Sequence, residues 1–124
     1  MAQPVPQPDA RQLFHHQRVG GDTGPLADGT AFTTTPIVAI VSVAGMRFLT
    51  FRGLTTTANA TVSFAFLRPD RATAYTTNNP TSFTITAGTE NTSGELTLNG
   101  QSWLQVTFTG AGSGTLNYLD VMGL

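Results

Sequence analysis

The chain has 124 residues, a formal net charge of −1 and no cysteine. This length suits one domain and is sufficient to bury a core without a metal or a disulfide. The lack of cysteine excludes disulfides, thiol nucleophiles and cysteine-based zinc sites. All six positive charges are scattered arginines, so there is no clustered basic patch and we expect no nucleic-acid partner. Charged residues make up only 10%, whereas Thr occurs 22 times, and this β-branched residue favours strands.

The first 32 residues differ in composition from the rest. They hold four of the seven prolines and the Gly20-Gly21 pair, which favours an extended N-terminal arm over 1–32 with a short helical turn at 9–17. The arm has no apolar stretch of the kind found in a signal peptide. Its apolar residues predict contacts with neighbouring subunits, and they are Leu13, Phe14, Val19, Leu26 and Phe32. We expect a truncation to 33–124 to fold and to assemble less well.

From residue 33 onward the apolar residues alternate with polar ones, as in β-strands. The pattern predicts seven or eight short strands and no helix, and therefore an all-β, antiparallel, jelly-roll-like β-sandwich over 33–124. Asn99-Gly100 predicts a hairpin, and the glycine-rich stretch 110–114 predicts another turn of that kind. The longest apolar stretch, 37–46, is about half the roughly 20 residues that cross a membrane, so we expect no membrane partner. The predicted core comprises Val38, Ile40, Phe48, Phe64, Phe66, Ile85, Leu96, Leu104, Val106, Phe108 and Leu119.

Few side chains in this sequence could carry catalysis. The two histidines, His15 and His16, are adjacent in the arm, and adjacent residues rarely point at one substrate. The carboxylates of the β domain all fall near expected turns or strand ends, and they are Asp70, Glu90, Glu95 and Asp120. We therefore expect no enzyme, no catalytic residue, no cofactor and no metal site. Calcium alone stays open, because 28–30 and the turn at Asp70 offer the oxygen ligands that it uses.

The extended arm, the Thr- and Gly-rich strands, the few charges and the stretch Trp103–Leu116 together resemble the small capsid decoration (cement) proteins of tailed bacteriophages. The resemblance extends over the whole chain in layout but includes no diagnostic motif. It implies a homotrimeric structural protein of the virion, located on the capsid surface. Its partners would be the major capsid protein or other virion subunits, and its role would be to stabilise the shell.

A carbohydrate-binding β-sandwich is the alternative function. The segment 106–121 is similar to the closing strands of galactose-binding-like jelly rolls. An aromatic platform for a glycan could come from Trp103, Tyr75 and Tyr118, with Arg68, Asp70 and Asn78 near them in sequence. A lone tryptophan in a sandwich usually fills the core, however, and we expect this of Trp103.

Overall fold

The computed structural model describes residues 15–18 and 26–123. All the regular structure in these ranges is β-strand, as the alternating sequence predicts. The strands are β1 (His15–Arg18), β2 (Thr30–Phe32), β3 (Ile37–Ser42), β4 (Phe48–Thr56), β5 (Ala60–Leu67), β6 (Phe83–Ile85), β7 (Asn91–Thr97), β8 (Trp103–Gly110) and β9 (Gly114–Gly123).

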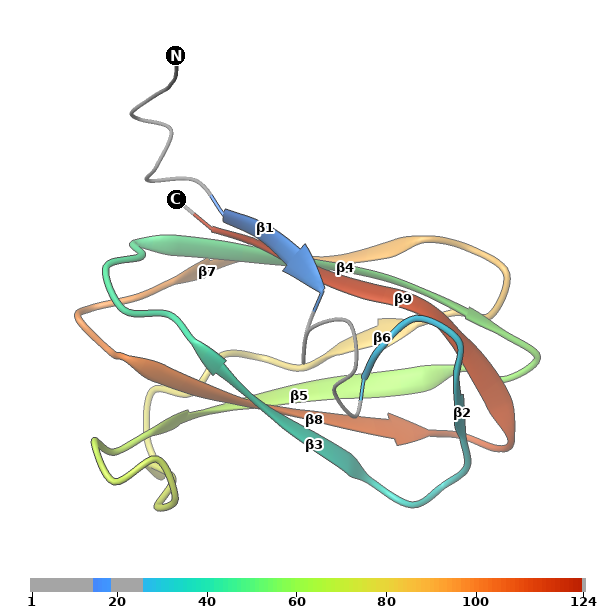
Figure 1. The fold of residues 1–124 in the computed structure, drawn as a ribbon, viewed down its shortest axis with the longest axis horizontal. Coiled ribbons are helices and arrows are strands. Elements are labelled where there is room, and N and C mark those ends of the chain that lie inside the picture. The colour runs from blue at the N-terminus through green and yellow to red at the C-terminus, as the bar shows by residue number, and fades with distance from the viewer. Residues whose placement is uncertain (1–14, 19–25, 124) are drawn as a thin grey trace, which may run out of the picture.

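The strands form two sheets that lie face to face (Figure 1). One sheet has the order β1-β9-β4-β7, and β2 also pairs with β9, near the start of that strand. The other sheet has the order β3-β8-β5-β6. All pairings are antiparallel, and most connections cross from one sheet to the other. The predicted fold class, an antiparallel jelly-roll-like β-sandwich, is therefore confirmed.

The core lies between the facing sides of the two sheets. Along β8 the even-numbered residues are buried and the odd-numbered ones are half-buried, so one face of each strand points inward. The rings of Phe51 and Phe64, from opposite sheets, lie 4.7 Å apart between centroids. Eight predicted core residues are buried, and they are Phe64, Phe66, Ile85, Leu96, Leu104, Val106, Phe108 and Leu119.

For three residues the prediction that they belong to the core is wrong. In each case the residues that face the core are shifted by one position along the strand from the predicted ones. On β3 the inward residues are Ala39 and Val41, whereas Val38 is 47% exposed and Ile40 is 43% exposed. Phe48 is only half-buried, since β4 also directs its odd-numbered residues inward. Apolar residues occupy both faces of these strands, so the sequence pattern does not fix which face is buried.

Neither predicted glycine turn closes a hairpin. Asn99-Gly100 connects β7 to β8, and 110–114 connects β8 to β9, but in both cases the two strands belong to different sheets. Gly100 has a φ of 89°, a conformation that suits such a sharp turn. These turns therefore connect strands of different sheets, although the same residues often connect neighbouring strands of a hairpin.

The sandwich begins earlier than residue 33. Both β1 and β2 fall in the expected arm, and both pair with β9, so the turn expected at 9–17 ends inside a strand. Leu26 and Phe32 are 0% and 3% exposed in the chain's own core, so the prediction that they contact a partner is wrong. The other predicted arm contacts, Leu13, Phe14 and Val19, lie outside the described residues.

The packing of Phe32 predicts how much the fold is destabilised when this side chain is removed. Its ring meets that of Phe108 edge to face, with centroids 5.0 Å apart, and a side chain at Gly114 would clash with it. We expect Phe32→Ala to lower the free energy of unfolding by about 3–5 kcal/mol, as measured by urea denaturation. The neighbouring Ala31→Ser is the control and should change it by at most about 0.5 kcal/mol, because Ala31 is exposed. Equal stability of both variants would contradict the placement of β2.

Candidate functional site

A groove lies at one end of the sandwich, between the long β5–β6 connection and the β7–β8 crossover. Its main pocket has a volume of about 390 Å³, which falls within the usual range for small-ligand sites. Its lining is mixed, with aromatic rings beside amides and hydroxyls. The lining residues are Phe66, Leu67, Pro69, Tyr75, Thr77, Asn78, Asn99, Gly100, Gln101, Ser102 and Trp103.

The β5–β6 connection, residues 68–82, begins with a tight turn around Asp70. Its carboxylate accepts hydrogen bonds from the backbone N–H groups of Ala72 and Thr73, each at 2.9 Å, and from the Thr73 hydroxyl at 2.6 Å. The backbone N–H of Arg71 donates to the carbonyl of Arg68 at 2.9 Å. Arg71 has a φ of 63°, a left-handed conformation that only a well-determined turn sustains in an arginine.

The second half of the connection is attached to the backbone of Phe66 on β5. The N–H of Phe66 donates to Asn79 Oδ1 at 2.8 Å, and the carbonyl of Phe66 accepts from the N–H of Tyr75 at 2.9 Å. Asn79 Nδ2 in turn donates to the carbonyl of Tyr75 at 2.7 Å. Asn79 therefore ties the segment that carries Tyr75 to the edge of the core.

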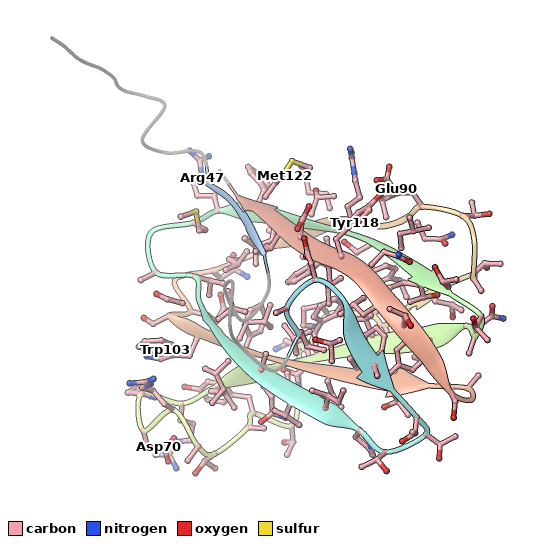
Figure 2. The ribbon with its side chains drawn as sticks, turned by 45° about the vertical axis from the view of Figure 1, so that its right-hand side comes forward. Arg47, Asp70, Glu90, Trp103, Tyr118 and Met122 are labelled. Atoms are coloured by element: carbon pink, nitrogen blue, oxygen red, sulfur yellow. The ribbon has the colours of Figure 1, made fainter. Side chains whose placement is uncertain are left out.

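Trp103 and Tyr75 meet at this groove. Trp103 is half-buried and belongs to the outward-facing residues of β8, so the expectation that it fills the core is wrong. The guanidinium of Arg71 lies over the indole, 4.3 Å from the ring centroid, which is a cation–π contact. Figure 2 shows Trp103 at the same end of the molecule as Asp70. Tyr75 is 45% exposed, and its ring offers the open aromatic surface of the groove.

The third predicted aromatic residue, Tyr118, belongs to a different surface. It lies on β9 in the other sheet, and its hydroxyl donates to the Glu90 carboxylate (Figure 2). This bond raises the pKa of Tyr118 to about 12, with smaller contributions from burial and from nearby carboxylates. The Arg52 Nε lies 3.9 Å from the Glu90 carboxylate. Tyr118 is therefore part of an exposed polar cluster and not of the groove.

The acidic residues of the described segments do not gather into a metal-binding cluster. Within 15–18 and 26–123, no group of three or more His, Asp or Glu side chains is close enough to hold an ion. No helix in these segments is long and apolar enough to span a membrane.

Sequence reasoning missed one lining residue, Gln101, and two residues that support the groove, Asn79 and Arg71. Asn78-Asn79-Pro80 indicates a turn, but the role of Asn79 depends on a backbone 13 residues away in sequence. Gln101 enters the groove only because Asn99-Gly100 crosses between sheets. Arg71 reaches the indole of Trp103 from a left-handed turn, which no local pattern marks.

No family model and no curated protein matches the chain. Among solved structures it is similar to tripeptidyl peptidase 2, with a TM-score of 0.61 and 11% identity over 89% of this chain. The chain spans only 10% of that peptidase chain, and the likeness is one of fold. It is also similar to the carbohydrate-binding module CBM36 in complex with calcium and xylotriose, with a TM-score of 0.42, 13% identity and coverage of 85% of this chain and 86% of that one.

The hydrogen bonds around Asp70 predict how the stability of this turn depends on pH. Three hydrogen bonds, first that from the Thr73 hydroxyl, lower the pKa of Asp70 from 3.8 to about 2, and Arg68 adds to this. Because the pKa is lowered on folding, the turn is fully stabilised above about pH 4, and this stabilisation is lost as the pH falls through 2. An NMR titration of Asp70 should give this pKa. Thr73→Val should raise it toward 3.8 while Thr73→Ser should not, and equal values in both variants would rule out the hydroxyl as the main cause.

Proposed function

We propose that this chain is a non-catalytic binding module and that the groove between 68–82 and the β7–β8 crossover binds a carbohydrate. The observation that carries the proposal is the convergence of Tyr75 and Trp103 with three carboxamide side chains in one pocket. The carboxamides are Asn78, Asn99 and Gln101.

The chemistry of the lining suits a sugar. A pyranose ring has an apolar C–H face, and the exposed ring of Tyr75 is a flat apolar surface on which that face would stack. A carboxamide offers both donors and an acceptor, so it can pair with a hydroxyl in either direction. In Gln101 the oxygen already accepts from the backbone N–H of Asn99, so this residue offers mainly its donors. Arg71 is not part of the lining, but its guanidinium covers the indole of Trp103 and so brings further donors beside the pocket.

The β5–β6 connection, which carries Tyr75 and Asn78, is held in place without a ligand. The turn at Asp70 and the attachment of Asn79 to Phe66 hold it through backbone and side-chain hydrogen bonds. A ligand would therefore bind without the entropic cost of ordering the loop.

The lining favours binding over hydrolysis. Glycoside hydrolysis uses a pair of carboxylates that flank the scissile bond. The pocket that contains Tyr75 and Trp103 is lined, among the described residues, by no Asp, Glu or His. We therefore propose that the ligand is held and released unchanged.

Glycan-array screening followed by calorimetry tests this function. We expect a saccharide to bind, and Tyr75→Ala to weaken its binding by at least about tenfold through loss of the stacking surface. Tyr118→Phe is the matched control, because Tyr118 lies on the other sheet, and it should leave the affinity unchanged. A ligand that binds equally well to both variants does not use this groove. A lack of any saccharide ligand would contradict the proposed function.

A role in virion assembly, as a capsid decoration protein, is the second candidate, and one observation favours it. Strand β3 forms an edge of its sheet, and among the described residues only β8 pairs with it. It carries no charge and exposes Val38 and Ile40. Proteins usually protect exposed edges with charges, so an uncharged apolar edge is a template for pairing with another chain.

Light scattering of the purified protein tests this second candidate. We expect a discrete oligomer, and Ile40→Lys should dissociate it because a lysine blocks pairing at the edge. Thr61→Lys is the control, since Thr61 is exposed on the interior strand β5 of the same sheet and should leave the mass unchanged. A monomer at all concentrations, together with no binding to capsids, would argue against assembly.

A further inference from the structure

A second pocket continues the groove. Its volume is about 280 Å³, and it lies between the end of the β5–β6 connection and the edge strand β7. Phe66 and Asn78 line both this pocket and the first one. The two pockets are therefore neighbours that meet at these two residues.

The two pockets differ in chemistry. The first contains the rings of Tyr75 and Trp103, whereas the second contains mainly hydroxyl groups with one carboxylate, and its only aromatic ring is the buried one of Phe66. The lining of the second is Phe66, Asn78, Pro80, Thr81, Ser82, Ser93, Glu95, Leu96 and Thr97. The hydroxyl of Ser93 is already bonded to the backbone of Phe51 and Gly94. Besides Asn78, the groups that remain to meet a ligand are the hydroxyls of Thr81, Ser82 and Thr97 and the exposed carboxylate of Glu95.

Asn78 occupies the junction in an unusual conformation. Its φ is 60°, it is exposed, and its side chain forms no hydrogen bond with any described residue. Asparagine tolerates this left-handed conformation better than most residues do, yet conformations of this kind persist mainly where the surrounding structure or a ligand requires them. At this position a carboxamide is within the lining of both pockets, where it can pair with hydroxyls on either side.

We propose that the groove is an oligosaccharide site with two subsites, in which one sugar stacks on Tyr75 and the next lies against Ser82 and Glu95, with Asn78 bonded to both. This inference rests on the proposed function, and it adds that the ligand has at least two sugar residues. The second subsite offers hydroxyl groups and a carboxylate, and its only aromatic ring, that of Phe66, is buried, so it strengthens binding of a sugar already held in the first. The ligand class is a neutral saccharide of at least two residues, because the Glu95 carboxylate would repel an acidic sugar at the second position.

Calorimetry and NMR with saccharides of one, two and three residues test the proposal. The probes are the β-1,4-linked series of glucose and of N-acetylglucosamine, together with the corresponding series of any sugar found on the array. We expect the affinity to rise at least about tenfold from one residue to two and by less than about threefold from two to three. Backbone amide shifts on binding the monosaccharide should be confined to residues near Tyr75, and those on binding the disaccharide should extend to Ser82 and Glu95.

Two variants separate the subsites. Asn78→Gly removes the carboxamide while keeping a residue that adopts a positive φ without strain, and Glu95→Gln removes only a charge. Glu95→Gln should bind the monosaccharide as the wild type does and should lose most of the gain shown by the disaccharide. Asn78→Gly should weaken the monosaccharide as well, because Asn78 also lines the first pocket, and it should lose most of that gain too. Tyr75→Ala should weaken both ligands. If monosaccharide and disaccharide bind equally to the wild type, the second subsite is wrong and the proposed function stands. If no saccharide of any length binds, the proposed function itself fails.

Discussion

Phe66 on β5 links the groove to the core, because it belongs to both at once. Its side chain is 3% exposed inside the sandwich, and its backbone N–H and carbonyl are bonded to Asn79 and Tyr75. Hydrophobic burial fixes the position of this strand. The two hydrogen bonds then hold the 15-residue connection between β5 and β6 against it. A connection of this length would otherwise have many conformations. The stability of the core is therefore what makes the groove a defined shape.

The sequence predicts the fold class because strand periodicity and threonine content are local properties. β5 and β8 alternate cleanly, and their inward residues Phe64, Val106 and Phe108 are correctly identified. β3 is apolar on both faces, so its alternation does not reveal which side faces the core, and the outward Ile40 was assigned to the wrong side. The crossovers were not predictable either, because an Asn-Gly pair favours the same sharp turn whether the next strand returns to its own sheet or enters the other one.

The candidate site was predictable only in its chemistry. The aromatic residues that could stack on a sugar form a short set in this sequence, and two of them, Tyr75 and Trp103, do meet at the groove. Tyr118 does not, since β9 places it on the opposite sheet beside Glu90. Proximity in space here depends on which sheet each strand joins and on the left-handed residues Arg71 and Asn78, and neither is encoded in a local pattern. The same reason explains why Leu26 and Phe32 appeared to be free for a partner, although β9 draws their segment into the core.

The two candidate functions use neighbouring parts of one sheet. In the register of β3 and β8, Ser42 stands opposite Trp103, and Ile40 stands opposite Gln105. If a strand from another chain paired with β3, then β3 would lie between that strand and β8, which carries the indole that Arg71 covers. The groove itself opens on the far side of Trp103, toward 68–82 and the β7–β8 crossover, and β3 contributes no residue to its lining. Pairing at the β3 edge would therefore leave the groove accessible, and an assembled module would present one such groove for each copy of the chain.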